Sequence, residues 1–179
     1  MSSNGESGDD TELMLRAAAG DDEAFCRLVR RHGPSLVSFF SANGAGSDAE
    51  DLAQRTFLKI HSMRRRYAAA AKFTTFMFVV ARRVLVDHLR AASRLAALHE
   101  RAGAEVETTE EAPRTRGEAE DAEAALAALS PPLREAVVLV VMRGLEYHEA
   151  AEALGVPTGT VKSRVHDALR RMREALLRQ

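Results

Sequence analysis

The 179-residue sequence contains a single cysteine, Cys26, and no tryptophan. One cysteine cannot form an intramolecular disulfide, and it argues against a structural zinc site built on cysteine pairs. The histidines show no metal-ligand spacing, and no glycine-rich phosphate loop is present. We therefore expect no metal, no cofactor and no enzymatic activity.

Long apolar runs are also missing, because no window approaches the roughly 18 uninterrupted apolar residues of a membrane span. The first residues are acidic, unlike those of a signal peptide. Aromatic residues make up 5% of the chain and hydrophobic residues 46%, which indicates helices packed through Ala, Leu and Val. These features predict a soluble intracellular protein with an all-α fold.

Charge is segregated along the chain, although the net charge is only -1. Residues 1–12 carry four acids and no base, and residues 103–124 carry eight acids against two arginines. The rest of the chain therefore carries +9. Because the helical patterns lie in that remainder, the folded parts are expected to be basic.

The two acidic segments divide the chain into parts. Residues 1–10 have almost nothing to bury, so we expect a disordered tail. Residues 103–121 hold hardly an apolar anchor and predict a flexible acidic linker, which can extend to about 60 Å. Helical patterns on either side predict two small domains, 11–102 and 122–179.

A basic amphipathic helix is predicted near the C-terminus, from Thr158 to Leu177. Its apolar residues form one stripe at 100° per residue, and they are Val161, Val165, Ala168, Leu169, Met172 and Leu176. A short helix over 147–154 precedes it, and residues 155–157, GVP, supply the stop between the two. This pattern predicts a helix-turn-helix, whose second helix enters the DNA major groove. An incidental helical hairpin is the alternative.

A second basic face is predicted on a long helix over residues 75–101. Arg83, Asp87, Arg90 and Arg94 are spaced by four, three and four residues, so they share one side of the helix. Alone, such a stripe fits an ordinary solvated surface equally well. Two basic faces in one chain favour nucleic acid as the partner.

Local signals predict further helix ends in the N-terminal half. Residues 47–50, SDAE, fit a capping box that begins a helix running to about residue 66. Residues 32–34, HGP, predict a break between helices over 22–31 and 36–42. In the C-terminal half, Ser130 and Pro131 fit the start of a buried helix over 133–142.

With these segments in order, the sequence resembles the extracytoplasmic-function sigma factors, the two-domain class of bacterial sigma factor. The matching strings are GDDEAFCRLVRRHGPSL, SDAEDLAQRTFLKIH, FMFVVARRVLVDHLR and LSPPLREAVVLVVMRGLEYHEAAEALGVPTGTVKSRVHDALRRMREAL. The resemblance implies a cytoplasmic protein that binds core RNA polymerase, recognises the minus-ten and minus-thirty-five promoter elements and promotes initiation. It also implies control by an anti-sigma factor and a role in stress response.

The resemblance assigns residues to these partners. Core-polymerase binding would fall to Asp48, Asp51, Gln54 and Phe57. The minus-ten element would be contacted by Phe76, Arg82, Arg83, Asp87 and Arg90. The minus-thirty-five element would be contacted by Thr160, Lys162, Ser163, Arg164, His166, Asp167 and Arg170. The apolar surface around residues 133–142 would meet the polymerase flap.

Some positions depart from the family's pattern. Phe76 stands where the family commonly has Trp, and residues 68–71 are all Ala in a loop that is usually more polar. Asp167 stands where an Arg often reaches DNA. An acid there can accept from cytosine but repels phosphate, so an unusual minus-thirty-five preference is expected. We further expect the acidic tail and linker to compete with DNA for the basic faces.

Two other classes of protein share part of this pattern. LuxR-type activators have a similar terminal helix-turn-helix, but the strings AEDLAQRTF and ARRVLVDHLR have no place in them. A sigma mimic would sequester an anti-sigma factor without binding DNA. Known mimics usually carry a receiver domain and have little reason to keep two basic faces.

Overall fold

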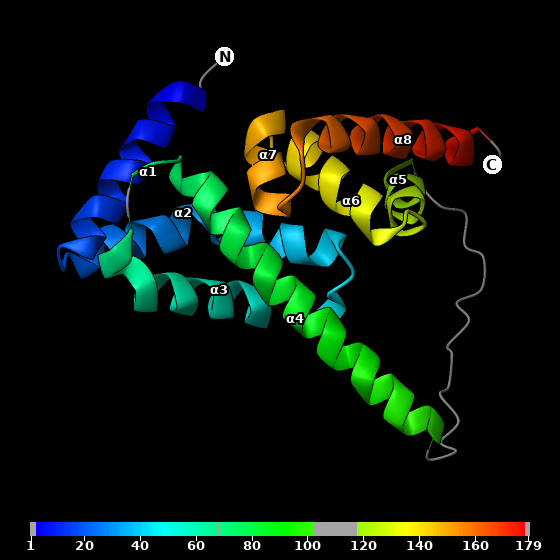
Figure 1. The fold of residues 1–179 in the computed structure, drawn as a ribbon, viewed down its shortest axis with the longest axis horizontal. Helices are drawn as coiled ribbons and strands as arrows, with labels where there is room; N and C mark the ends of the chain where they lie inside the picture. Colours follow the sequence, from blue (N-terminus) through cyan, green and yellow to red (C-terminus); the bar gives the residue numbers. More distant parts are fainter. Residues whose placement is uncertain (1–2, 68, 102–117, 178–179) are drawn as a thin grey trace.

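The computed structural model describes residues 3–67, 69–101 and 118–177, in which all regular structure is helical (Figure 1). The N-terminal module consists of α1 (Ser3–Ala18), α2 (Asp22–Ala42), η1 (Gly46–Asp48), α3 (Ala49–Met63), η2 (Arg64–Arg66) and α4 (Phe73–Arg101). The C-terminal module consists of α5 (Glu118–Ala127), α6 (Pro131–Val137), η3 (Val138–Met142), α7 (Tyr147–Leu154) and α8 (Thr158–Leu176). The expected all-α class is confirmed.

The start of helix α2 is stabilised by a local side-chain cap. Its N-cap is Asp21, whose carboxylate accepts a hydrogen bond from the backbone N–H of Ala24 at 3.0 Å. That bond, followed by one from Arg16, lowers the pKa of the Asp21 carboxyl. The hydrogen bonds at this cap therefore favour the ionised form of Asp21.

The predicted break at residues 32–34 is wrong, because α2 runs without interruption through Pro34. A proline inside a helix removes one backbone hydrogen bond and costs about 3 kcal/mol. Leu28 before it and Leu36 after it are both fully buried. Tertiary packing on both sides of the proline offsets the local cost, and no local signal reports such packing.

The predicted capping box at residues 47–50 is also wrong. Ser47 lies inside the 3-10 turn η1, and α3 begins only at Ala49. The N-cap is Asp48, which makes no side-chain capping bond. The turn starts at Gly46 with φ of 54°, a left-handed conformation that glycine accepts without strain.

The N-terminal segment differs from the expected tail over residues 1–10, because α1 begins at Ser3. The acids near the end of that segment pair with α2. Asp9 lies 2.8 Å from Arg31, and Asp10 contacts both Arg31 and His32, the latter at 2.8 Å. These partners are more than 20 residues away in sequence, so the acidic composition alone did not indicate them.

The predicted acidic linker over 103–121 lies mostly outside the described residues, which resume with α5 at Glu118. The corner between α5 and α6 is held by Arg134, which donates hydrogen bonds to backbone carbonyls at the end of α5. The acceptors are Leu126 at 3.1 Å, Leu129 at 2.9 Å and Ala127. The guanidinium group of Arg134 thereby donates to carbonyls that have no intrahelical partner at the end of α5.

The apolar segment after Pro131 is helical as predicted, but it does not form one regular buried helix. Ser130 is the N-cap and Pro131 the first helical residue, as expected. From Val138 to Met142 the helix widens into the π-helical segment η3. Its last two residues, Val141 and Met142, are exposed and leave an apolar surface.

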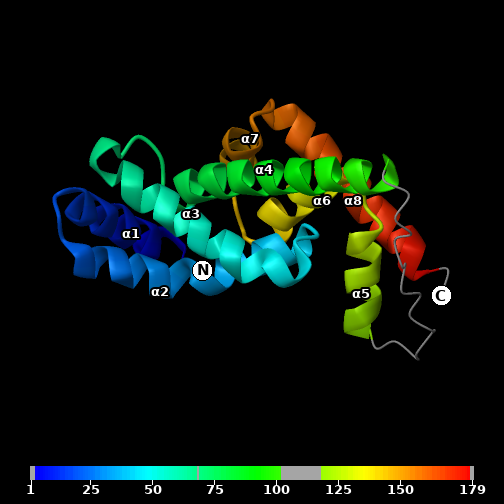
Figure 2. The ribbon, with the colours of Figure 1, turned by 90° about the horizontal axis from the view of Figure 1, so that it is seen from below.

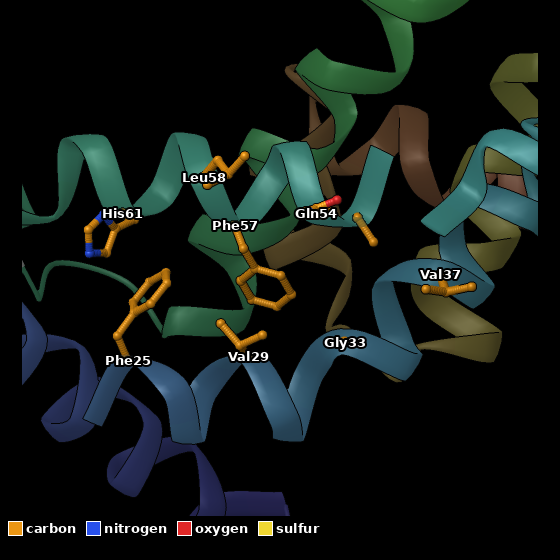
Figure 3. A pocket seen from close by; sticks show the side chains of 9 residues that line it. Phe25, Val29, Gly33, Val37, Gln54, Phe57, Leu58 and His61 are labelled. Carbon is orange, nitrogen blue, oxygen red and sulfur yellow. The ribbon is translucent and has the colours of Figure 1, made fainter. Parts of the chain in front are cut away.

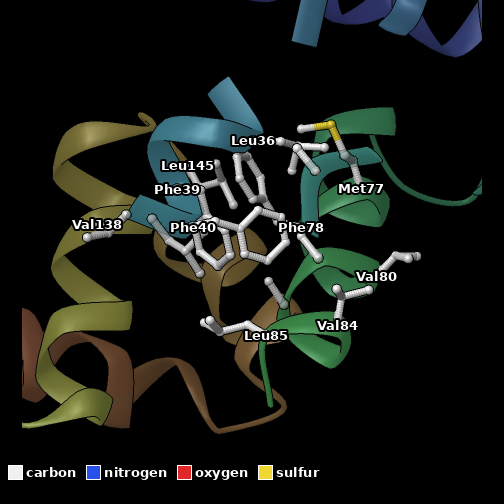
Figure 4. Close-up of a cluster of buried hydrophobic side chains, with 14 of the residues drawn as sticks. Leu36, Phe39, Phe40, Met77, Phe78, Val80, Val84, Leu85, Val138 and Leu145 are labelled. Atoms are coloured by element: carbon white, nitrogen blue, oxygen red, sulfur yellow. The ribbon is translucent and has the colours of Figure 1, made fainter. Parts of the chain in front are cut away.

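The two modules share one hydrophobic core (Figure 4). Phe39 of α2 and Phe78 of α4 lie 5.3 Å apart between ring centroids. Val138 and Leu145 of the C-terminal module belong to the same cluster. In the same region α7 packs against α4, and Figure 2 shows the C-terminal module lying beside α4. The pattern that predicted two domains gave no indication of this packing.

Candidate functional site

The four residues predicted to bind polymerase lie at the start of α3 and along it, but they do not share one side of the helix. Asp48 lies 3.6 Å from His88 of α4, and Asp51 lies 2.7 Å from Arg55 one turn later. Gln54 is exposed, whereas Phe57 is only 6% exposed. The structure thus brings three polar residues to the surface and buries most of the aromatic ring.

Phe57 nevertheless lines an apolar groove between α2 and α3 (Figure 3). The groove has a volume of about 480 Å³ and is lined by Phe25, Val29, Gly33, Val37, Ala53, Gln54, Phe57, Leu58 and His61. Phe57 packs edge-on against Phe25, with ring centroids 6.4 Å apart. The exposed Leu58 also lines this groove, and the sequence analysis did not assign it to the polymerase site. An apolar residue on the outward face of an amphipathic helix could have indicated a binding surface there.

The start of α4 holds the aromatic residue predicted to contact the minus-ten element. Phe76 is half-buried and packs edge-on against Tyr67, with ring centroids 5.3 Å apart. The Tyr67 hydroxyl donates a hydrogen bond to the Ala71 carbonyl at 3.4 Å, and burial raises the pKa of that phenol. Phe76 therefore lies on a packed corner at the N-terminal end of the helix.

The charged residues of α4 divide into two groups. Arg83, Asp87 and Arg90 are exposed, as their spacing predicts, and Asp87 lies 3.7 Å from Lys59 of α3. Arg82 differs, because its Nε donates a hydrogen bond at 2.8 Å to Glu135 of α6. The structure thus separates Arg82 from the solvent-facing group.

A second ion pair joins the modules a short distance away. Lys72, just before α4, lies 3.1 Å from Glu149 of α7 and 3.9 Å from Glu146. Glu149 also accepts a hydrogen bond at 2.9 Å from the backbone N–H of Glu146, as part of a capping box that begins α7. Sequence reasoning missed this box because Glu is not a usual N-cap residue.

The predicted helix-turn-helix is present. Helix α7 ends at Gly155, whose φ of 63° and ψ of 37° form a left-handed cap, and α8 begins after Pro157. The first three residues of the predicted apolar stripe, Val161, Val165 and Ala168, are buried. The stripe fades along the helix, since Leu169 is 45% exposed and Leu176 is exposed as well.

The other side of α8 carries the predicted minus-thirty-five residues. Lys162, Ser163, His166 and Arg170 are exposed, while Thr160, Arg164 and Asp167 are half-buried. Two of these residues make local contacts. The Lys162 Nζ lies 5.8 Å from the Tyr147 ring centroid, and the Ser163 hydroxyl donates a hydrogen bond to the Thr160 carbonyl at 3.0 Å. Cationic and hydrogen-bonding groups thus stand together on one open helix face.

Asp167 is not an isolated acid on this face. Its carboxylate lies 3.6 Å from Arg170, which in turn lies 3.6 Å from Glu174. The neighbouring guanidinium reduces the repulsion that Asp167 alone would exert on a phosphate.

Metal-ligand clusters and membrane-spanning helices are both absent from residues 3–67, 69–101 and 118–177. Within these ranges, no three His, Cys, Asp or Glu side chains gather closely enough to hold a metal ion. In the same ranges, no helix combines the length and apolar character needed to cross a bilayer.

Both modules match known sequence families. Residues 28–95 match the family described as sigma-70 region 2, and residues 119–172 match sigma-70, region 4. Among curated proteins, the chain is similar to the ECF RNA polymerase sigma factor SigC of Mycobacterium tuberculosis, with 34% identity over 174 residues, covering 93% of this chain and 89% of SigC. It is 33% identical to the ECF RNA polymerase sigma factor SigF of Caulobacter vibrioides over 168 residues, covering 93% of each.

The fold is also similar to solved structures. The sigma factor RpoE from Bartonella quintana, in complex with the anti-sigma factor NepR, superposes with a TM-score of 0.71 at 28% identity, covering 85% of this chain and 96% of that chain. CnrH, solved with the cytosolic domain of CnrY, also gives a TM-score of 0.71, over 94% of this chain and 97% of that chain. At 24% identity, the likeness to CnrH shows the fold alone.

Proposed function

This chain belongs to the extracytoplasmic-function RNA polymerase sigma factors, and we propose that it divides the family's tasks among three helices. Helix α3 binds core polymerase, α4 with the loop before it contacts the minus-ten element, and α8 reads the minus-thirty-five element. The observation that carries this division is the open polar face of α8, presented by a left-handed turn at Gly155. No catalytic group is required, because catalysis belongs to the polymerase.

The polymerase site combines the α3 surface with the adjacent apolar groove. Gln54 lines the recess together with Phe57 and Leu58, and Asp48 and Asp51 add exposed carboxylates at the start of the same helix. A helix with apolar side chains and a basic flank complements such a surface, since apolar anchors supply affinity and rim charges supply specificity. The exposed Val141 and Met142 of η3 would form a separate apolar contact with the polymerase flap.

At the minus-ten element, α4 supplies phosphate contacts and Phe76 supplies a stacking surface. Arg83 and Arg90 are exposed on the same side of the helix and can follow a DNA backbone. Aromatic rings stack on unpaired bases, which stabilises an opened strand by about 1–3 kcal/mol per base. Phe76 and Tyr67 are the aromatic residues in reach at this corner.

At the minus-thirty-five element, the first turns of α8 enter the major groove. Ser163, Arg164 and His166 can donate to base edges, while Lys162 and Arg170 contact phosphates. Asp167 can accept a hydrogen bond from cytosine, and its nearby Arg170 keeps the local charge favourable to DNA.

Control by an anti-sigma factor is part of the proposal. The RpoE structure that this fold resembles was solved bound to the anti-sigma factor NepR. A protein that covers the α3 groove or the α4 surface would block polymerase or DNA. We further propose that the chain acts in the cytoplasm, where the polymerase and its DNA template are.

Reconstitution with core polymerase tests this function. The purified chain is mixed with core enzyme and genomic DNA, and the transcripts are sequenced from their 5′ ends. We expect start sites that share one upstream motif pair, absent when core enzyme is used alone. Transcripts without a shared motif, together with tight binding to an anti-sigma factor, would instead identify a sigma mimic.

A further inference from the structure

A polar cavity lies where the start of α4 meets the turn between η3 and α7. It has a volume of about 440 Å³, and α1, α2, α4 and residues 143–149 all contribute to its wall. We propose that this cavity binds a small organic phosphate and that the guanidinium of Arg143 binds the phosphate group. The wall contains none of the residues assigned to polymerase or to promoter DNA.

Arg143 is a cation of this wall that has no counter-charge of its own. Its Nε is buried and has no hydrogen-bond partner within residues 3–67, 69–101 and 118–177. Burial lowers the pKa of the Arg143 guanidinium, because removal from water disfavours the charged form. A bound anion would offset that cost, since a buried charge is tolerated where it is paired.

The three carboxylates of the wall already have cationic neighbours. Two of them, Asp10 and Glu149, have only 4% and 8% of their side chains exposed, whereas Glu146 is 65% exposed and screened by water. The pairs are Asp10 with Arg31 and with His32 at 2.8 Å, Glu149 with Lys72 at 3.1 Å, and Glu146 with Lys72 at 3.9 Å. The buried acids are therefore compensated, and the charge of Arg143 remains for a ligand.

The backbone around Arg143 is fixed before any ligand binds. The Arg143 N–H donates a hydrogen bond to the Val138 carbonyl at 2.9 Å, and the Leu145 N–H donates to the Leu139 carbonyl at 3.1 Å. Between them Gly144 has φ of 70°, a left-handed conformation that glycine accepts without strain. A turn held in this way loses little conformational entropy when a ligand binds.

Two hydroxyl groups add further hydrogen-bond donors. Ser35 of α2 and Thr74 of α4 are half-buried and line the same cavity. Neither hydroxyl makes a hydrogen bond to another group in the described part of the chain. A phosphate group has three strong acceptor oxygens, so it can accept from a guanidinium and from two hydroxyls together.

The cavity is larger than a phosphate ion needs and is apolar along part of its wall. Its volume falls within the range of about 300–1,000 Å³ that is usual for small-molecule sites. Met77, Phe78 and Leu145 line it from the shared core (Figure 4). These side chains suit the carbon skeleton of a metabolite, so we infer an organic phosphate rather than the free ion.

Such a ligand would contact both modules at once. Ser35 and Thr74 belong to the N-terminal module, and Arg143 belongs to the C-terminal module. A ligand that binds only the packed arrangement shifts the equilibrium toward it. Its concentration would therefore oppose the binding of core polymerase to the separated modules.

Calorimetric titration of the full chain tests the site. The probes are phenyl phosphate, glycerol phosphate and AMP, with inorganic phosphate, phenol, glycerol and adenosine as reference compounds at matched ionic strength. Arg143→Gln removes the guanidinium, and Ser35→Ala with Thr74→Val removes both hydroxyls. Arg66→Gln, at an exposed position outside the cavity, is the matched control.

We expect one of the three organic phosphates to bind with one-to-one stoichiometry, at least about tenfold more tightly than inorganic phosphate or its own phosphate-free counterpart. Arg143→Gln should weaken that binding about tenfold and the double hydroxyl variant less, while Arg66→Gln leaves it unchanged. Absence of binding by all three probes, equal binding of inorganic phosphate, or undiminished binding by Arg143→Gln would overturn the proposal.

Stability without ligand separates a binding role of Arg143 from a structural one. Because its Nε has no partner to lose, Arg143→Gln should keep the thermal midpoint of the free chain, and only the increase produced by the bound probe should disappear. A lowered midpoint without ligand would assign Arg143 to packing instead. This readout contains neither polymerase nor DNA, so it stands apart from the proposed function.

The coupling to polymerase is measured separately by fluorescence anisotropy. The apparent Kd of the chain for core polymerase should rise as the probe saturates the cavity, and Arg143→Gln should abolish that rise. A Kd that does not change at saturating probe would contradict the coupling between the cavity and the modules.

Discussion

Helices α4 and α8 both carry basic faces, but they present them differently. On α8, Lys162, His166 and Arg170 are exposed, and the apolar stripe beneath them packs within the same module. On α4, Arg82 is engaged by Glu135 of the other module. One of the two faces proposed to contact DNA is open in the free chain, while the other is partly occupied.

The difference follows from what each helix buries. Helix α8 packs a narrow stripe, fully buried only from Val161 to Ala168 and partly buried at Met172, while Leu169 is already 45% exposed. Helix α4 contributes Phe78 and Leu85 to the core shared by both modules. A helix at the centre of the core cannot present all its charged side chains to solvent. The exposure of charged residues on α4 therefore depends on where the C-terminal module lies.

The largest expected effect concerns this central packing. Phe78→Ala should lower the free energy of unfolding by about 3–5 kcal/mol, because Phe78 is 2% exposed and contacts Phe39. Leu169→Ala on α8 should cost less than about 1 kcal/mol. Denaturant unfolding measures both. Similar losses for the two variants would mean that α4 is no more central than α8.

The second effect separates neighbouring arginines on α4. Arg82→Ala should destabilise the free chain by about 1–3 kcal/mol, since it leaves Glu135 buried without its partner. Arg83→Ala, at an exposed position, should change stability by less than about 0.5 kcal/mol. The two variants are compared by urea denaturation at neutral pH. Equal values would contradict the inter-module pair.

The third effect concerns the open face of α8. Arg164→Ala should weaken promoter binding by the holoenzyme about tenfold, through loss of a base or phosphate contact worth about 1.4 kcal/mol. Binding to core polymerase should stay unchanged, as measured by fluorescence anisotropy. Arg173→Ala, further along the helix, is the control. Equal loss of both affinities would make α8 a packing element.

The smallest effect concerns Asp167. Asp167→Asn should change the base preference at one position of the minus-thirty-five element by less than about 1 kcal/mol. The carboxylate favours a cytosine donor, whereas an amide can both donate and accept. Affinities for four duplexes that differ at that base pair report the change. A uniform shift across all four would mean that Asp167 acts through its charge near the DNA phosphates rather than through a contact with a base.

Sequence alone was sufficient where structure depends on nearby residues. Gly155 and Pro157 mark the turn of the helix-turn-helix because a left-handed cap and a helix breaker act locally. The spacing of Arg83, Asp87 and Arg90 likewise predicted one exposed face. The residue assignments to polymerase and to each promoter element rest on resemblance and stay predictions.

Sequence was insufficient where distant residues decide the outcome. Pro34 sits inside α2 because buried leucines on both sides hold the helix together. Arg82 and Glu135 are 53 residues apart, and nothing in either local pattern indicates their contact. The same applies to Asp10 and Arg31, which draw the expected tail into helix packing.

The most direct test compares two variants in two states of the protein. Promoter duplex affinity is measured for Arg82→Ala and Arg164→Ala, first in the free chain and then in holoenzyme, on a promoter recovered by transcript sequencing. We predict that Arg164→Ala weakens binding in both states, whereas Arg82→Ala weakens it only in holoenzyme. Weakening of free-chain binding by Arg82→Ala to the same extent as in holoenzyme would contradict a masked α4 surface.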